Sequence, residues 1–137
     1  MDIIVTDAPD PGLRDLILDG LIAYNETQAG PSGARPLAVL VRDDDQRVVG
    51  GLWAWTAYGW LSIELLFLPA DLRGRDLGTQ VMRRAEEEAR RRGCREAWLD
   101  TFGFQARGFY ERLGYETFGQ LDGYPQGYAR YFMRKAL

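Results

Sequence analysis

The strongest constraint on the fold is a basic, glycine-containing loop that lies between an apolar strand and an amphipathic helix. The apolar run Leu65 to Leu68 ends at Pro69, and residues 72–79, with the sequence LRGRDLGT, then open a helix. The first turn of a helix carries N–H groups without intrahelical partners, and these groups hold a partial positive charge. A phosphate or another anion is therefore the favoured occupant in front of this loop.

Size and composition predict one globular domain, residues 1–137, that buries its own core. Hydrophobic residues make up 46% and charged residues 27% of the chain, and the net charge of -3 offers no basic field for nucleic acid. The single Cys94 excludes an internal disulfide framework and favours a reducing compartment. We expect a cytoplasmic protein without a signal peptide, membrane span or nucleic-acid partner.

The hydrophobic periodicity predicts seven strands and three helices. The strands are expected at residues 3–6, 37–42, 48–57, 60–68, 95–101, 115–122 and 127–134, and the helices at about 13–24, 77–92 and 106–113. This order predicts an α/β fold with a mixed, mainly antiparallel, twisted sheet of about seven strands and helices on both faces.

The predicted helix after the loop has one apolar face and one charged face. Its apolar positions are Leu77, Val81, Met82, Ala85 and Ala89, and Gly93 supplies a stop. We expect the charged face at 83–91 to point to water, with Glu86–Arg90 and Glu87–Arg91 as supportive pairs.

Residues 48–135 resemble the GNAT superfamily of acetyl-CoA-dependent N-acetyltransferases. Arg73 and Gly78 match the ends of the family's glycine-loop pattern, and residues 109–115, with the sequence FYERLGY, match its second element. The predicted order of elements is also that of the GNAT fold. Asp76 departs from the pattern, because the family usually has its middle glycine there.

The resemblance implies a site for acetyl-CoA. The diphosphate would be held by the backbone amides of Arg73, Gly74, Arg75, Asp76, Leu77, Gly78 and Thr79, and the pantetheine arm by the backbone of Leu66, Phe67 and Leu68. Gln105 and Phe109 are further candidate contacts, Gln105 because it stands close to Gly103, where the family often has an asparagine. A carboxylate beside a diphosphate is repulsive, so we expect Asp76 to weaken binding relative to the family norm.

Tyr110 matches the family's tyrosine and is the candidate general acid for the departing thiolate. Its alternative role is a buried aromatic residue. Glu64 is the candidate base, because it interrupts an apolar run and follows Ile63 as in the spermidine/spermine acetyltransferase branch. A solvated or ion-paired glutamate is the alternative, and Asp100 is the rival base.

The acceptor pocket is less defined by sequence. Aromatic residues gather on two hairpins, Trp53, Trp55, Tyr58 and Trp60 on one and Tyr124, Tyr128 and Tyr131 on the other. These clusters could belong to the core, to an interface or to a cage for a cationic amine. Asp122, Glu116 or Asp100 could supply the negative charge of an amine pocket.

The predicted function is acetyl transfer from acetyl-CoA to a primary amine of a small molecule, polyamine or amino-acid-like acceptor. Protein lysine or N-terminal acetylation and a non-catalytic CoA-binding module are the alternatives. We expect no metal, because the chain has no histidine. Many members of the family are dimers, and the aromatic last hairpin is a candidate interface for a homodimer.

Overall fold

A computed structural model describes residues 1–137, and the chain divides into two compact units, residues 1–32 and 33–137. The first unit contains helix α1, Leu13–Ala29, in which no residue is buried. The strand expected at residues 3–6 is absent, and Ile3 and Val5 are 99% and 96% exposed. A β-branched segment forms a strand only where a neighbouring strand takes up its backbone groups, and residues 3–6 have none.

The second unit is built on a six-stranded sheet, one strand fewer than expected, in the order β1-β2-β3-β4-β6-β5. The strands are β1 Arg35–Arg42, β2 Val48–Ala57, β3 Trp60–Phe67, β4 Glu96–Phe102, β5 Glu116–Asp122 and β6 Ala129–Ala136. Only β3 and β4 pair in parallel, and the other neighbours are antiparallel. The mixed, mainly antiparallel α/β sheet of the prediction is therefore confirmed.

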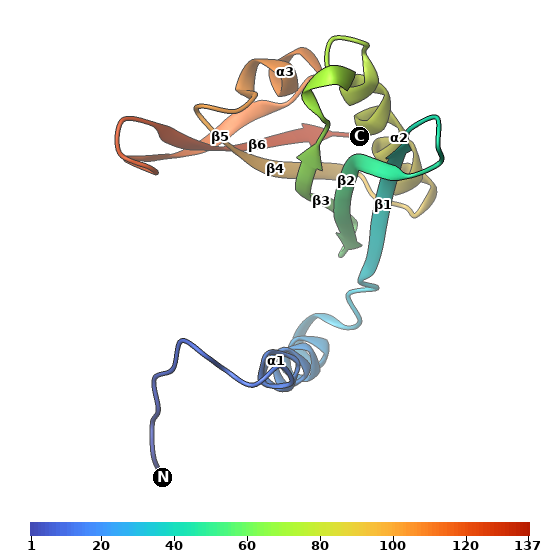
Figure 1. The fold of residues 1–137 in the computed structure, drawn as a ribbon. Coiled ribbons are helices and arrows are strands. Elements are labelled where there is room, and N and C mark those ends of the chain that lie inside the picture. Colours follow the sequence, from blue (N-terminus) through green and yellow to red (C-terminus); the bar gives the residue numbers. More distant parts are fainter. The chain divides into compact units, whose positions relative to one another are not determined.

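Helices α2, Leu77–Arg91, and α3, Arg107–Arg112, lie on the same side of this sheet (Figure 1). A short 3-10 turn, Ala70–Leu72, precedes α2. Met82 of α2 and Tyr110 of α3 belong to one buried cluster together with Leu61 and Leu99 of the sheet. Within residues 33–137 the helices thus cover one face, which we call the covered face, and helices on both faces are not found there. No helix is long and apolar enough to cross a membrane.

The opposite face, which we call the open face, carries the alternate residues of each strand. Trp53 and Trp55 of β2 are exposed there, at 43% and 37%. On β4 and β6 this face holds Trp98, Asp100, Phe102, Arg130, Phe132 and Arg134, which pair across the two strands. Aromatic side chains on the open face are therefore available for contacts beyond the core.

The charged face of α2 differs from its prediction at Glu86, which is only 3% exposed. The Glu86 carboxylate accepts a hydrogen bond from the Tyr115 hydroxyl at 2.7 Å and from Lys135 Nζ at 2.9 Å. The expected i,i+4 pairs on this helix are replaced by Arg91–Glu88 and Arg92–Glu88. A partner on β6 explains why Glu86 turns inward, since a buried carboxylate requires compensation.

Candidate active site

The two parallel strands separate partway along their length. Their pairing runs from Trp60 opposite Glu96 to Ile63 opposite Leu99 and then stops. Beyond this point β3 stays paired with β2, and β4 stays paired with β6. A wedge with unpaired backbone edges therefore opens between the strands, as expected for the stretch that contains Leu66 and Phe67.

One hydrogen bond ties the strands together just before the wedge. Trp98 Nε1 donates to Ser62 Oγ at 2.7 Å, on the open face. The next residues after the last paired ones, Ile63 and Leu99, are Glu64 and Asp100. Because Leu99 is buried on the covered face, alternation places Asp100 on the open face, and Glu64 is exposed at the same level of the neighbouring strand.

Free backbone donors precede α2. The first hydrogen bond into this helix is donated by the Gln80 amide to the Asp76 carbonyl, at 3.1 Å. The amides of Gly74, Arg75, Asp76, Leu77, Gly78 and Thr79 have no hydrogen-bond partner within the chain. The Arg73 amide is engaged, because it donates to the Ala70 carbonyl at 3.3 Å. Six of the seven expected amides thus suit an anion.

Arg73 fixes this loop to the end of β3. Its Nε donates to the Leu68 carbonyl at 3.0 Å, so that carbonyl already has a partner. The Arg73 side chain therefore has a positioning role, and its guanidinium adds positive charge beside the free amides. Leu66 and Phe67 remain the unpaired part of β3 toward β4.

Asp76 occupies a left-handed backbone conformation, with φ 63° and ψ 13°. Glycine adopts this region without strain, and aspartate is among the few other residues that tolerate it. This explains how Asp76 can stand where the family pattern has glycine. Its carboxylate makes no capping hydrogen bond to α2, so it adds a negative charge at the helix start without a hydrogen bond that fixes its position.

Glycine suits positions 74 and 78 of the loop for two different physical reasons. Gly74 has a φ of 76°, with open space around it. At Gly78 a Cβ atom would lie 3.2 Å from the ring of Phe109, which is tighter than an ordinary contact and would require the ring to shift. Phe109 of α3 thus packs against the first turn of α2, and the two predicted cofactor residues are brought together.

Tyr110 is buried in the cluster on the covered face and is 8% exposed. Its ring packs edge-on against Phe109 and Tyr115. Burial raises the pKa of Tyr110 to about 12, and the Asp100 carboxylate adds to the increase. The phenol is therefore protonated at neutral pH and able to donate a hydrogen bond into the wedge.

Glu64 is the extra residue of a β-bulge in β3. Trp53 pairs with Leu65 and Ala54 pairs with Ile63, so Glu64 has no opposite residue on β2. Bulges commonly redirect a side chain beside an active site. Glu64 is exposed and makes no salt bridge, which leaves its carboxylate available to accept a proton.

Asp100 is engaged, in contrast to Glu64. Its Oδ2 atom accepts hydrogen bonds from Nε and Nη2 of Arg130. Both side chains are partly buried, with 21% and 26% of their surfaces exposed. A carboxylate oxygen that already accepts from two N–H groups is less available to a substrate amine, so the geometry favours Glu64 of the two candidates.

The side chain of Gln105 caps the C-terminal end of β4. Its Oε1 accepts hydrogen bonds from the Phe102 amide at 2.7 Å and from the Thr101 hydroxyl at 3.1 Å. The side-chain oxygen is thus occupied, and only the NH₂ group of Gln105 can donate to a ligand.

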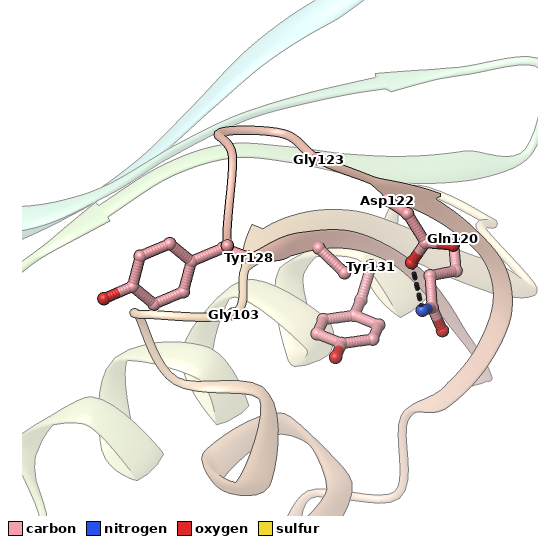
Figure 2. A pocket seen from close by; sticks show the side chains of 8 residues that line it. Gly103, Gln120, Asp122, Gly123, Tyr128 and Tyr131 are labelled. Atoms are coloured by element: carbon pink, nitrogen blue, oxygen red, sulfur yellow. Dashed lines mark hydrogen bonds between the residues drawn. The ribbon is translucent and has the colours of Figure 1, made fainter.

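A polar pocket of about 480 Å³ lies beside the last hairpin. Figure 2 shows Gln120 and Asp122 on one side of it, joined by a 2.7 Å hydrogen bond, and Tyr128 on the other. Tyr131 also lines it, beneath the guanidinium of Arg107 of α3, 4.0 Å away. This pocket therefore lies on the covered face, whereas Arg130 points to the open face.

The sequence analysis missed Arg130 and the rings around it. The Arg130 guanidinium carbon lies 5.1 Å from the ring of Phe102, 4.9 Å from that of Tyr124 and 5.5 Å from that of Phe132. A signal existed, because period-two alternation along 129–136 places Arg130 and Phe132 on one face. Only the pairing of β4 with β6 brings Asp100 to the same place.

Fold and site together define an α/β protein with a splayed parallel strand pair beside an anion-binding helix start. The sequence model of the Acetyltransferase (GNAT) family matches residues 9–115, which is most of the chain. The chain belongs to this family and is an N-acetyltransferase; the resemblance drawn from residues 73–78 and 109–115 is confirmed. The family uses acetyl-CoA.

Relatives agree with this assignment. An acetyltransferase of Agrobacterium fabrum is 38% identical over 98% of this chain and 98% of its own length. The blasticidin-S acetyltransferase of Streptomyces morookaense is 36% identical, over 76% of this chain and 79% of its own length. The crystal structure of a candidate acetyltransferase from Agrobacterium tumefaciens matches all of both chains with a TM-score of 0.94 and 38% identity.

Proposed function

We propose that this N-acetyltransferase transfers the acetyl group of acetyl-CoA to the amine of a small molecule by direct attack. The observation that carries the proposal is the wedge between β3 and β4 next to free amides of residues 74–79. A diphosphate at those amides directs an extended thioester arm into the wedge, between Tyr110 and Glu64. The similarity to a blasticidin-S acetyltransferase supports a small-molecule acceptor.

Each residue in the wedge has a distinct role in this proposal. Glu64 takes the proton of the attacking amine, directly or through water. Tyr110 donates a hydrogen bond to the departing sulfur. Because a thiol has a pKa of about 8.5 and burial raises the pKa of Tyr110 to about 12, complete proton transfer to the thiolate is uphill. Hydrogen-bond stabilisation of the thiolate is therefore the main contribution of Tyr110.

The backbone of Leu66 and Phe67 lies along the proposed path of the pantetheine arm, and the free amide edge of the wedge polarises the thioester carbonyl. Gln105 and Phe109 border this path from the covered face. We assign no metal to the reaction, because the thioester is already activated for attack. The Asp76 carboxylate opposes the diphosphate and lowers its affinity.

The direct test is thiol release from acetyl-CoA against a panel of small amines, polyamines, amino acids and short peptides. We expect release with at least one small amine and a fall of about 10²-fold in kcat for Glu64→Gln. Asp100→Asn tests the rival base, and Glu116→Gln is the matched control at an exposed glutamate of β5. Release with peptides alone would indicate a protein acetyltransferase, and unchanged kcat in Glu64→Gln would remove Glu64 as the base.

We further propose that residues 1–137 act as one acetyltransferase domain, since the family match spans both units. A cytoplasmic location and a homodimer through the last hairpin remain predictions. Sedimentation velocity measures the oligomeric state, and a single species at the mass of one chain would contradict the dimer.

A further inference from the structure

We infer that the acceptor carries a carboxylate beside its amine and an apolar or planar body, as an aromatic amino acid does. The inference rests on the proposed acetyl transfer and concerns the open face at the mouth of the wedge. The groups that carry it are the Asp100–Arg130 pair and the aromatic side chains around it.

The pair offers a free acceptor oxygen on Asp100 and guanidinium N–H groups of Arg130 beyond those already engaged. Arg130 donates from Nε and from Nη2 to the same oxygen of Asp100, Oδ2. No hydrogen bond engages Oδ1 of Asp100, and of the five guanidinium N–H groups of Arg130 two face Asp100 and one has the Tyr124 hydroxyl as its partner. A ligand with a cationic amine and an anionic carboxylate complements this pair, because the amine donates to Oδ1 of Asp100 and the carboxylate accepts from the remaining guanidinium N–H groups of Arg130.

The pair lies where the acceptor must arrive. Asp100 is the first residue of β4 beyond the parallel pairing, level with Glu64 of β3. The Asp100 carboxylate is also close enough to contribute to the raised pKa of Tyr110, which enters from the covered face. An amine held at Oδ1 of Asp100 would therefore lie between Glu64, the proposed base, and Tyr110, the proposed hydrogen-bond donor to the sulfur.

Aromatic rings form the remaining wall of this site. Phe102 and Phe104 stack with centroids 5.2 Å apart, and Tyr124 lies 5.5 Å from Phe102. Phe104 is 53% exposed and Tyr124 is 45% exposed, although both are large apolar rings. Exposed stacked rings beside a guanidinium favour a ligand with a flat or apolar body.

The ion pair also argues against a purely cationic acceptor. A polyamine site needs several unpaired negative charges, and of the two carboxylates at the mouth of the wedge Asp100 is already neutralised by Arg130. The positive guanidinium would repel a second ammonium group. A zwitterion avoids this repulsion, because its own charges match the two charges of the pair.

The test compares three probes that differ only at the carboxylate: L-phenylalanine, its methyl ester and 2-phenylethylamine. Both thiol release and calorimetric binding to the CoA-loaded enzyme are measured. We expect L-phenylalanine to exceed the other two by at least about 10-fold in kcat/KM and in affinity. Equal values for the three probes, or no binding of any of them, would overturn the inference.

Arg130→Lys tests whether the guanidinium binds the carboxylate of the acceptor, since lysine keeps the positive charge but lacks the planar group that binds a carboxylate with two N–H donors. We expect it to lower kcat/KM about 10-fold for L-phenylalanine and by clearly less for 2-phenylethylamine. Arg134→Lys is the matched control, because Arg134 lies on the same strand and the same face. An equal loss for both probes in Arg130→Lys would mean a structural role and overturn the inference.

The ring wall has its own control pair. Phe104→Ala is expected to reduce the preference for L-phenylalanine over L-alanine, whereas Phe118→Ala, at a similarly exposed ring on β5, is not. Tight binding of L-phenylalanine without thiol release from any amine would contradict the proposed function and still support this site.

Discussion

Tyr110 is the residue whose chemistry the structure constrains most, because it is buried and its pKa is raised to about 12. We predict that Tyr110→Phe lowers kcat by about 10²-fold and changes the stability little, since the ring stays in place. Steady-state thiol release and urea unfolding measure the two effects. Because the pKa is so high, the wild-type rate should show no loss from Tyr110 ionisation at pH 9. Unchanged kcat in the variant would reduce Tyr110 to a packing role.

Asp76 combines a left-handed backbone with a charge at the helix start. We predict that Asp76→Gly and Asp76→Asn both tighten acetyl-CoA binding, because each removes the negative charge and tolerates this conformation. Asp76→Ala should instead destabilise the fold by about 1 kcal/mol, since alanine disfavours the left-handed region.

Calorimetry with acetyl-CoA and thermal unfolding separate these effects at Asp76. Asp71→Asn, in the preceding 3-10 turn, controls for the loss of a nearby charge. Weaker binding in both Asp76→Gly and Asp76→Asn would give Asp76 a role in holding the cofactor.

Residue chemistry was largely predictable where it follows a local pattern. The free amides of the loop at 73–79 and the burial of Tyr110 agree with the local sequence pattern. The αL backbone of Asp76, the bulge at Glu64 and the pairing of Asp100 with Arg130 were not predictable, because each depends on a neighbouring strand or on backbone geometry that composition does not encode.

At the scale of elements, α2 is joined to β6 by a buried polar network. Glu86 of α2 is held by Lys135 of β6 and by Tyr115. We predict that Lys135→Met lowers the free energy of unfolding by about 3 kcal/mol, because it leaves a buried carboxylate without its cation. Adding Glu86→Gln should restore part of the loss.

Urea unfolding measures this prediction against Glu111→Gln, which breaks an exposed pair with Arg107 and should cost less than about 0.5 kcal/mol. A loss in Lys135→Met no larger than that of the control would contradict the network.

Element prediction succeeded for β1 to β6 because each strand has an apolar alternation and a partner. It failed at residues 3–6, where the same composition has no neighbouring strand. The charge pattern at 83–91 was interpreted as a solvated face, and Glu86 departs from it only because Lys135 lies across from it. Partners distant in sequence explain both errors.

At the scale of the whole molecule, two buried tyrosines predict how stability depends on alkaline pH. Burial raises the pKa of Tyr110 to about 12, and burial and the Glu86 carboxylate raise the pKa of Tyr115 further. The protonated phenols therefore favour the folded state. Their contribution is complete below pH 10, the unfolded pKa, and is lost as the pH rises above that value.

We therefore predict a fall in the free energy of unfolding between pH 10 and 12 that is smaller in Tyr110→Phe. Chemical unfolding across this range measures it, and Tyr24→Phe, at an exposed tyrosine of α1, is the control. A wild-type slope identical to that of Tyr110→Phe would contradict the predicted burial of this phenol.

The account rests on the binding of a diphosphate by the amides in front of α2, and calorimetry with matched ligands tests it most directly. Acetyl-CoA is compared with S-acetylpantetheine, which has the same thioester arm and no diphosphate. We predict measurable binding of acetyl-CoA and at least about 100-fold weaker binding of S-acetylpantetheine. Equal affinity for the two ligands, or no heat with either, would contradict the account.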